Sequence, residues 1–142
     1  MQFKFIRTKD PEYGKELMIR WEVLFKPLGK PPGAEVLPNE DKSLHYVALD
    51  KKTVVGCVLF CPDEQSRGFL HQMAVSEEYQ GRGFGRKLLT SFEQALAGKG
   101  VSEILLQTPV EKVGFYHRMG YHPSGSSTEK FGTFYQLMTK TL

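Results

Sequence analysis

The sequence predicts a mixed α/β domain in which helices flank a mostly antiparallel, twisted sheet of about seven strands. The predicted elements run in the order strand, helix, a meander of strands, helix, strand, helix and a final pair of strands. One helix connects the apolar segments 69–75 and 101–108, so these segments, the fourth and fifth strands, are expected to be parallel neighbours. The chain of 142 residues suits one domain covering residues 1–142.

The N-terminal third begins with a strand and a helix. Residues 2–6 (QFKFI) alternate apolar and polar side chains, as strands do. Between Pro11 and Leu28 apolar residues recur at helical spacing, with a proline near each end. The next segment, 29–41, is rich in proline and glycine and predicts a loop lying over a site. Segments 43–49 and 53–60 flank a short polar turn, which predicts a hairpin.

The rest of the chain is divided by glycines and prolines that mark turns and helix ends. We expect a turn at residues 62–68, a strand at 69–75 and a glycine loop at 76–85. A helix at 86–100, a strand at 101–108 and a short helix at 109–120 follow. Residues 121–127 and 132–142 are expected to form an antiparallel strand pair.

Composition argues against several classes of protein. The net charge is +3 and the isoelectric point about 8.8, with lysines and arginines scattered among acids. This mild excess does not predict a nucleic-acid partner, but it suits an anionic ligand. The sequence starts without an apolar leader and has no apolar run of membrane-spanning length, so we expect a cytoplasmic protein without a membrane partner.

The two cysteines, Cys57 and Cys61, lie in one apolar run. If the run is a strand, residues four apart share a face but lie about 13 Å apart, too far for a disulfide. We expect two reduced thiols in a core strand. No cluster of histidines and cysteines has zinc spacing, and we expect no metal.

The stretch YQGRGFGRKLLT places three glycines, Gly81, Gly83 and Gly85, directly before a leucine-rich helix. The first N–H groups of a helix lack backbone acceptors, and the helix dipole makes that end positive. Glycines let an anion approach this backbone, and nearby Arg82, Arg86 and Lys87 add charge. The stretch therefore predicts a phosphate cradle, with a plain flexible turn as the alternative.

The spacing of the cradle distinguishes between phosphate-binding motifs. A Walker loop requires G-x-x-x-x-G-K-[ST], which is absent, and the dinucleotide fingerprint G-x-G-x-x-G opens a βαβ unit, unlike this loop. Residues 80–85 instead read Q-G-R-G-F-G, and residues 115–121 read F-Y-H-R-M-G-Y. With the strand that ends at Val75, these segments resemble the [QR]-x-x-G-x-[GA] and F-Y-x-x-x-G-[FY] signatures of the GCN5-related N-acetyltransferases (GNAT family), and the resemblance covers nearly the whole chain.

The resemblance implies the GNAT fold, with a splayed parallel pair of strands, and acetyl-CoA as co-substrate. In the family the pyrophosphate lies on the glycine loop and the pantetheine arm pairs with the strand before it. Many members place an asparagine near the end of the second strand of the pair, where this chain has Gln107 and Thr108. The cofactor-binding residues implied are Met73, Ala74, Val75, Gln80, Gly81, Arg82, Gly83, Phe84, Gly85, Arg86, Gln107 and Phe115.

The resemblance also implies two catalytic residues. Tyr116 stands where the family's usual general acid stands, four residues before Gly120. A phenol with a pKa near 10 suits protonation of a departing thiolate; the alternative is a tyrosine that only packs beside the pantetheine. His71 stands where arylalkylamine acetyltransferases carry a histidine, whereas the base of histone-type members corresponds to Phe69. Two alternatives remain open: His71 is a hydrogen-bonded core histidine, or the reaction uses no dedicated base.

The acceptor site is expected at the first helix, the loop after it and the last hairpin. Trp21, Phe25 and Tyr135 are the candidate substrate-binding residues, with His45 and Phe134 as further candidates; for Trp21 and Phe25 core packing is the alternative.

The function implied is transfer of an acetyl group from acetyl-CoA to a primary amine of a small molecule, by direct attack in a ternary complex. A CoA-binding sensor without turnover and a protein acetyltransferase acting on lysines or N-termini are the alternatives. A homodimer through an edge strand at the C-terminus is also open.

Overall fold

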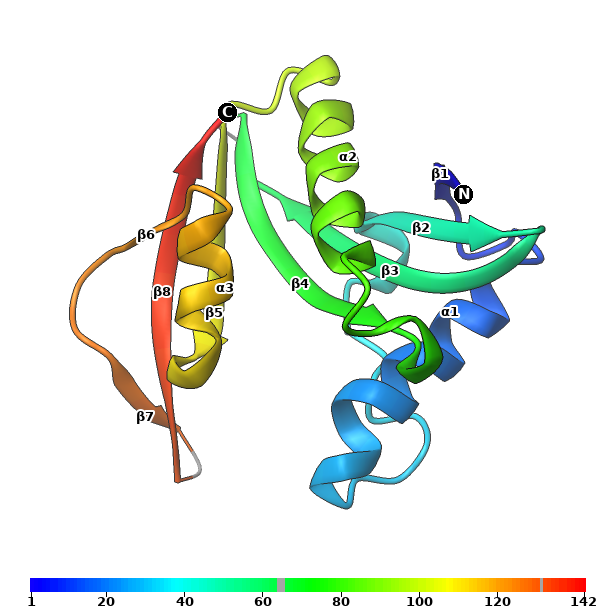
Figure 1. The fold of residues 1–142 in the computed structure, drawn as a ribbon, viewed down its shortest axis with the longest axis horizontal. Coiled ribbons are helices and arrows are strands. Elements are labelled where there is room, and N and C mark those ends of the chain that lie inside the picture. The colour runs from blue at the N-terminus through cyan, green and yellow to red at the C-terminus, as the bar shows by residue number, and fades with distance from the viewer. Residues whose placement is uncertain (64–65, 131) are drawn as a thin grey trace.

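A single mixed sheet runs through the computed structural model, which describes residues 1–63, 66–130 and 132–142 (Figure 1). Every strand pairing is antiparallel except that between β4 and β5, as the sequence predicted. Across the sheet the strands follow the order β1 (Gln2–Ile6), β2 (Leu44–Asp50), β3 (Thr53–Pro62), β4 (Arg67–Val75), β5 (Glu103–Pro109), β8 (Thr133–Thr141) and β6 (His122–Pro123), and β7 (Thr128–Lys130) also pairs with β8.

The C-terminal strands differ from the prediction. The expected partner of the last strand, residues 121–127, splits into the two-residue β6 and a separate β7, which gives eight strands among the described residues. Both pair with β8 on the side away from β5, so β8 lies inside the sheet and the prediction of a C-terminal edge strand is wrong. The predicted turn at 62–68 lies partly outside the described residues.

The helices keep their predicted places but differ in detail. α1 (Tyr13–Arg20) continues as a π-helical turn (Trp21–Phe25) and a 3-10 turn (Lys26–Leu28), so the predicted single helix changes its winding. α2 (Phe84–Gly98) starts two residues before the predicted helix and takes Gly85 into its first turn. α3 (Val113–Arg118) follows a short 3-10 turn at Val110–Lys112. Two further 3-10 turns, Glu40–Lys42 and Glu77–Tyr79, were not predicted.

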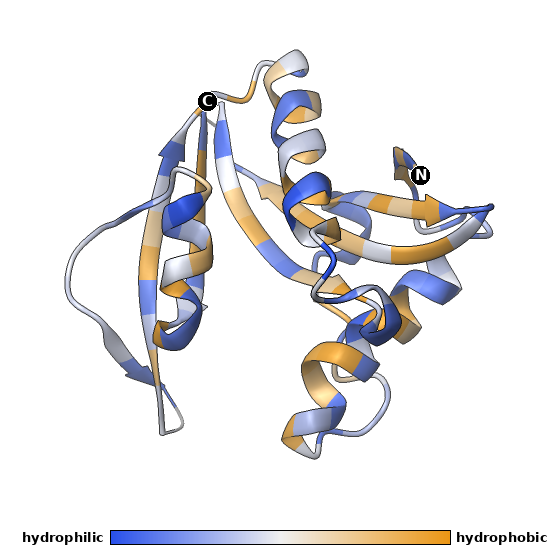
Figure 2. Cartoon of the chain, viewed as in Figure 1, coloured by the Kyte–Doolittle hydropathy of each residue, from blue (hydrophilic) through white to orange (hydrophobic). Residues whose placement is uncertain are grey.

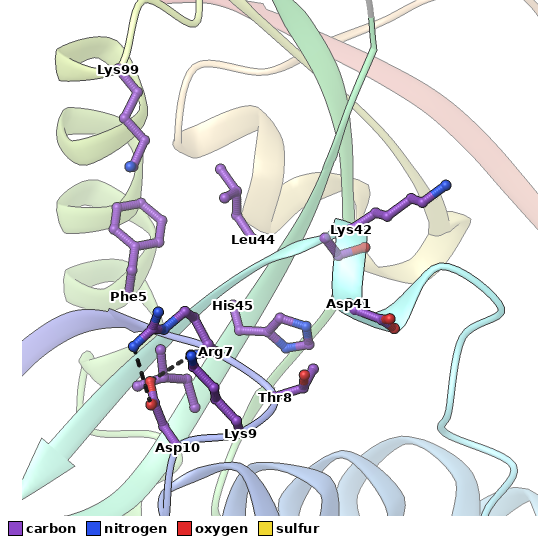
Figure 3. A pocket seen from close by; sticks show the side chains of 12 residues that line it. Phe5, Arg7, Thr8, Lys9, Asp10, Asp41, Lys42, Leu44, His45 and Lys99 are labelled. Atoms are coloured by element: carbon purple, nitrogen blue, oxygen red, sulfur yellow. Dashed lines mark hydrogen bonds and ion pairs between the residues drawn. The ribbon is translucent and has the colours of Figure 1, made fainter.

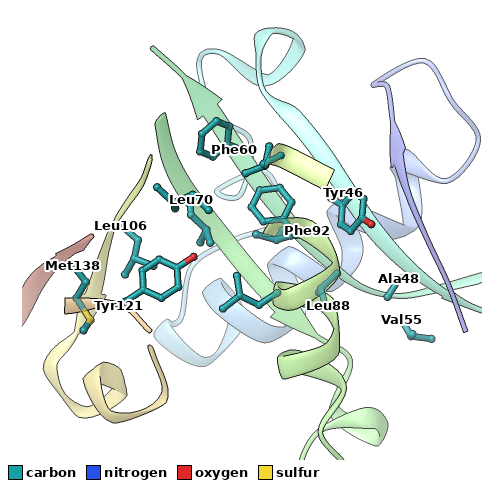
Figure 4. Packing of buried hydrophobic residues seen from close by; sticks show 14 residues of the cluster. Tyr46, Ala48, Val55, Phe60, Leu70, Leu88, Phe92, Leu106, Tyr121 and Met138 are labelled. Atoms are coloured by element: carbon teal, nitrogen blue, oxygen red, sulfur yellow. The ribbon is translucent and has the colours of Figure 1, made fainter. Parts of the chain in front are cut away.

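Both faces of the sheet are covered, and β2 and β3 are accordingly hydrophobic along most of their length (Figure 2). One cluster joins α2 to the sheet, with Phe92 against Tyr46 and Phe60 and with Tyr121 and Met138 behind α3 (Figure 4). The smaller cluster packs Ile19 of α1 against strand residues that include Val47 and Cys57. The two clusters fix the positions of α1 and α2 relative to β4.

An irregularity in β4 opens the sheet. Cys57 pairs with Ala74 and Leu59 pairs with His71, so β4 spans three residue steps where β3 spans two. The extra residue forms a β-bulge, and Gln72 within it has a left-handed φ of 48°. β4 pairs with β5 only from Arg67 to Phe69, after which the two strands diverge (Figure 1).

Four buried charged side chains lie beneath this bulge. The Arg20 guanidinium bonds the carboxylates of Glu16, at 2.8 Å, and Glu40. Nδ1 of His45 lies 2.8 Å from a Glu16 oxygen, and its Nε2 lies 2.8 Å from the backbone carbonyl of Glu40. Both neighbours are acceptors, so both ring nitrogens donate and His45 is an imidazolium. We call Glu16, Arg20, Glu40 and His45 the buried charge cluster; it carries two positive and two negative charges.

The cluster shifts the titration of its members. Burial lowers the pKa of His45, but the hydrogen bonds to Glu16 and to the Glu40 carbonyl outweigh it, and the pKa ends above its ordinary value. Burial raises the pKa of Glu40, and the opposing bonds from Arg20, the Leu37 amide and Tyr13 bring it below its ordinary value.

Both cysteines are free thiols. Cys57 is buried, as predicted, and burial raises the pKa of its thiol. Cys61 is only half-buried and accepts a hydrogen bond from Nδ2 of Asn39 at 2.7 Å. Within the described residues, no helix has both the length and the apolar character needed to cross a bilayer.

The buried imidazolium predicts a pH dependence of stability. Because the folded-state pKa of His45 is raised, its contribution is complete below the ordinary value of about 6.5 and is lost as pH rises through the folded pKa. We expect the urea midpoint of the wild type to fall above neutral pH, and His45→Gln to flatten that fall. Parallel profiles for the two proteins between pH 6 and pH 9 would contradict a charged His45.

Candidate active site

A continuous groove runs from the N-terminus of α2 to the split between β4 and β5. It consists of three cavities of about 490, 230 and 240 Å³, and neighbouring cavities share wall residues. Val75, Gln80 and Phe115 line both the first and the second, while Leu24, Met73, Lys112 and Tyr116 line both the second and the third. The glycine loop, the end of β4 and α3 thus face one space.

The glycine loop gives the groove an anion-binding end. Gly81 and Gly83 have left-handed φ values of 74° and 82°, which glycine adopts without strain. Gly83 is the N-cap of α2 and supplies no side-chain cap. The first N–H groups of α2 are therefore available to an anion. A Cβ on Gly83 would meet nothing within 4 Å, so the backbone conformation, rather than crowding, favours glycine here.

Gly85 has a different role, because it brings the first turn of α2 against β4 and α3. A Cβ there would lie 3.6 Å from Cε of Met73, 3.9 Å from Cγ2 of Val75 and 4.0 Å from Cζ of Phe115. These are ordinary contacts, and they place Phe115 at the junction of the first two cavities. Three predicted cofactor-binding residues therefore meet around Gly85.

The basic side chains of the loop are placed differently from one another. Arg86 and Lys87 line the first cavity, as a phosphate-binding role requires. Arg82 lies over the rings of Tyr79 and Phe84, at 5.3 and 5.2 Å, and donates from Nη1 to the Glu78 carbonyl at 3.2 Å. Arg82 is thus held against the loop, with its charge beside the cradle rather than in its wall.

The end of β4 forms the side of the groove. Met73, Ala74 and Val75 lie beyond the segment that pairs with β5, so the edge of β4 that faces β5 has no strand partner at these residues. Gln80 of the loop donates from Nε2 to the Val75 carbonyl at 2.8 Å, which ties the loop to that strand end. An extended ligand arm along this edge would find backbone groups suited to strand-like pairing.

Tyr116 lies at the inner end of the groove. Its hydroxyl points to the sulfur of Met73 at 3.9 Å, a weak acceptor, and its ring packs edge-on against Phe115 and Tyr121. Burial raises the pKa of Tyr116 to about 12, so the phenol keeps its proton at neutral pH. The side chain is a proton donor in contact with a poor acceptor, which suits transfer to a better one.

His71 lies on β4 and lines the third cavity with Tyr116. Its ring stacks on Phe69 at 6.2 Å, and within the described part of the chain its side chain makes no hydrogen bond. Burial lowers the pKa of His71, so the imidazole is neutral at neutral pH and has a free lone pair. The geometry brings a proton donor and a proton acceptor to one cavity.

The remaining predicted residues lie at varying distances from the groove. Gln107 is exposed and lines the third cavity, and the adjacent Thr108 is buried, with its hydroxyl bonded to the Pro109 carbonyl. Trp21, Phe25 and Tyr135 lie outside the walls of the three cavities. The indole of Trp21 donates to the Lys30 carbonyl at 3.0 Å, and Tyr135 pairs with Thr128 at the end of β8. Their substrate-binding role stays a prediction.

The two further acceptor-site candidates, His45 and Phe134, differ in their burial. His45, a suggested acceptor wall, belongs to the buried charge cluster and is 1% exposed. Phe134 is exposed on β8. Within the π-helical turn, Val23 and Leu24 pack against the second core cluster and line the groove, whereas Trp21 and Phe25 belong to neither core cluster.

Sequence reasoning missed Leu24, Gln72 and Lys112 as groove residues. Lys112 stands one helical turn before Tyr116, and that i, i+4 spacing was a usable signal. Gln72 lines the groove because of the bulge, which depends on pairing with β3 and leaves no pattern in the sequence.

Another cavity, of about 680 Å³, is larger than each of the three groove cavities and shares no wall residue with them (Figure 3). It lies between the start of the chain and the segment before β2, and its walls include the basic Arg7, Lys9 and Lys42 and the acidic Asp10 and Asp41. Arg7 and Asp10 already bond one another, at 2.8 Å from the Arg7 amide. This basin has no glycine loop, and the histidine that lines it, His45, is held by the buried charge cluster, so the groove is the better candidate site.

Within the described residues, one trio could offer metal ligands: Glu16, Glu40 and His45, whose ligand atoms lie within 4.8 Å of one another. The Arg20 guanidinium bonds both carboxylates and His45 is protonated, so the trio does not suit a cation.

Comparison with known proteins places this chain in a family. Residues 41–123 match the family described as acetyltransferase (GNAT) domain. N-alpha-acetyltransferase 30 of Schizosaccharomyces pombe is 31% identical over 83 residues, which cover 54% of this chain and 55% of that protein. An acetyltransferase of Yersinia pestis is 28% identical over 127 residues, covering 85% of this chain and 87% of that protein. The chain spans about half the length of two of the curated relatives it matches.

Solved structures share the fold. An acyl-CoA N-acyltransferase from Pseudomonas aeruginosa superimposes with a TM-score of 0.84 at 16% identity, covering 98% of both chains. A GNAT family acetyltransferase from Elizabethkingia anophelis with acetyl-CoA bound has a TM-score of 0.74 at 15% identity, covering 99% of this chain and 97% of that one.

The cradle predicts losses of acetyl-CoA affinity of very different size for two substitutions of one glycine. Gly83→Ala adds a methyl group into open space and only strains the backbone, so acetyl-CoA affinity should fall a few-fold. Gly83→Glu adds a carboxylate beside the anion site and should abolish measurable binding in a calorimetric titration. If Gly83→Glu binds acetyl-CoA as tightly as Gly83→Ala does, the diphosphate lies elsewhere.

The lowered pKa of His71 predicts a pH–rate profile. A neutral base is active, so kcat/KM, expressed per concentration of neutral amine, should be level above about pH 6.5 and fall only in more acidic buffer. His71→Gln should lower the rate about 100-fold or more and remove the acidic limb. An acidic limb that persists unchanged in His71→Gln would assign it to another group.

Proposed function

The chain belongs to the GNAT family of acetyltransferases, and we propose that it transfers an acetyl group from acetyl-CoA to a primary amine of a small molecule. One observation carries the proposal: a single groove leads from the uncapped N-terminus of α2 to a cavity lined by both Tyr116 and His71. The diphosphate of the donor is proposed to bind the loop of residues 81–86, and its pantetheine arm the end of β4.

The proposed reaction is direct attack in a ternary complex. The neutral amine nitrogen attacks the thioester carbonyl, a C–N bond forms and the C–S bond breaks. His71, directly or through water, takes the proton that the amine loses, and Tyr116 gives its proton to the leaving thiolate. The neutral imidazole and the protonated phenol described above have the protonation states that this scheme requires.

The acceptor end of the groove favours a small molecule. Its cavity of about 240 Å³ accommodates a compact amine, and of the described residues that line it none is acidic while Lys112 is basic. A polyamine would bring several positive charges to this wall without a carboxylate to pair them. We therefore propose an acceptor that carries no positive charge besides its amine. The protein is proposed to act in the cytoplasm without a nucleic-acid or membrane partner.

A second candidate function is acetylation of a protein N-terminus. It is favoured by the 31% identity to N-alpha-acetyltransferase 30, although that similarity covers about half of each chain. A gain of one acetyl mass on a peptide, with no transfer to free amines, would favour it.

Self-association is proposed only through β1 or the β6–β7 side, because these form the outer edges of the sheet.

Replacing the proposed acid separates an enzyme from a sensor. Tyr116→Phe removes only the hydroxyl, so acetyl-CoA affinity should be kept while kcat falls about 100- to 10,000-fold. The kcat is compared with whichever amine the wild type acetylates in a panel of neutral, anionic and polycationic amines. The measurement is thiol release beside calorimetry, with Tyr46→Phe, whose hydroxyl bonds Ser91 away from the groove, as control. A wild type that binds acetyl-CoA but acetylates no amine or peptide supports the sensor instead.

A further inference from the structure

Arg20 links the N-terminal helix to the strand that lines the groove. It is fully buried, and its guanidinium donates in three directions. Nη1 bonds Glu16 and Glu40, Nη2 bonds the Glu35 carbonyl at 2.5 Å, and Nε bonds Oε1 of Gln72 at 2.6 Å. The buried charge cluster is therefore connected to β4 through one neutral side chain.

Gln72 is the point of attachment on β4. It lies in the bulge with a φ of 48°, a left-handed conformation that glutamine rarely adopts. The amide uses both ends, because Oε1 accepts from Arg20 and Nε2 donates to the Glu35 carbonyl at 3.0 Å. One backbone carbonyl of the loop thus receives donors from α1 and from the bulge.

The residues on either side of Gln72 carry the proposed chemistry. His71 precedes it and lines the cavity beyond the split, and Met73 follows it and receives the Tyr116 hydroxyl. The bulge sets the direction of both side chains relative to β5, where the pairing has already ended at Phe69. Fixing the amide of Gln72 therefore fixes the geometry at the acetyl end of the donor.

We propose that Arg20 and Gln72 are positioning residues, which hold the β4 bulge so that His71 and Tyr116 face the thioester. The inference rests on the proposed function, and neither residue takes part in proton transfer. It assigns the buried charge cluster a task beyond stability: Glu16, Glu40 and His45 fix Arg20, and Arg20 fixes the strand.

Gln72→Asn and Gln72→Gly test the attachment. Both replacements tolerate a left-handed backbone, but the asparagine amide is one methylene shorter and glycine has none. Lys52→Gly is the matched control, because Lys52 is also left-handed (φ 71°) but lies in the exposed β2–β3 turn. Arg20→Lys keeps the charge and loses the planar set of donors; if it fails to fold, the Gln72 variants still decide.

Two readouts are expected to change together. Hydrogen exchange of the amides at residues 69–75 should accelerate about tenfold or more in both Gln72 variants, with residues 88–96 unchanged. The kcat should fall about 10- to 100-fold, while the acetyl-CoA dissociation constant and the amine KM stay close to those of Lys52→Gly. The unfolding midpoint should fall below that of Lys52→Gly, because the buried Nε of Arg20 loses its acceptor.

Several results would overturn the inference. Unchanged hydrogen exchange at residues 69–75 in the Gln72 variants would show that Gln72 does not hold the bulge. Faster exchange with unchanged kcat would show that holding the bulge does not affect catalysis. A raised amine KM at constant kcat would make Gln72 an acceptor-binding residue. A wild type without turnover ends the proposed function and the positioning role with it, and the exchange measurement then reports separately on the attachment.

Discussion

The end of pairing between β4 and β5 at Phe69 is the constraint on which the site depends. A parallel pair that continued to Val75 would close the sheet and leave no space between His71 and α3. The bulge at Gln72 places one extra residue in β4 opposite the segment between Cys57 and Leu59 of β3, so the strand leaves the plane shared with β5. The groove, the unpaired strand edge and the position of Tyr116 all follow from that departure.

The buried charge cluster shows how the fold maintains this irregularity. A strained bulge persists when its surroundings determine it fully, and here those surroundings are an arginine, two carboxylates and an imidazolium without solvent exposure above 6%. Burying charges costs solvation, and removing one partner of such a set costs about 3–5 kcal/mol because the others stay unpaired. The cluster thereby couples α1 and the loop before β2 to β4, the strand that lines the groove.

Local patterns predicted most of the fold. Alternation and helical spacing placed β1 to β5, β8 and the three α-helices near their observed positions, and the glycine stretch predicted the uncapped start of α2. The bulge, the π-helical turn and the division of residues 121–130 into β6 and β7 were not predictable, because each depends on partners far along the chain. Arg20 illustrates the limit: on a helix a charged residue indicates an exposed position, yet it is fully buried because its partners come from residues 35, 40 and 72.

The account makes its most direct claim about where the donor lies. A crystal structure with CoA bound should place the diphosphate on the amides of residues 82–86, the pantetheine beside Met73–Val75 and the sulfur next to the Tyr116 hydroxyl. A diphosphate held by Arg7 and Lys42 in the larger basin, or a pantetheine along β5 with its sulfur away from Tyr116, would contradict the account.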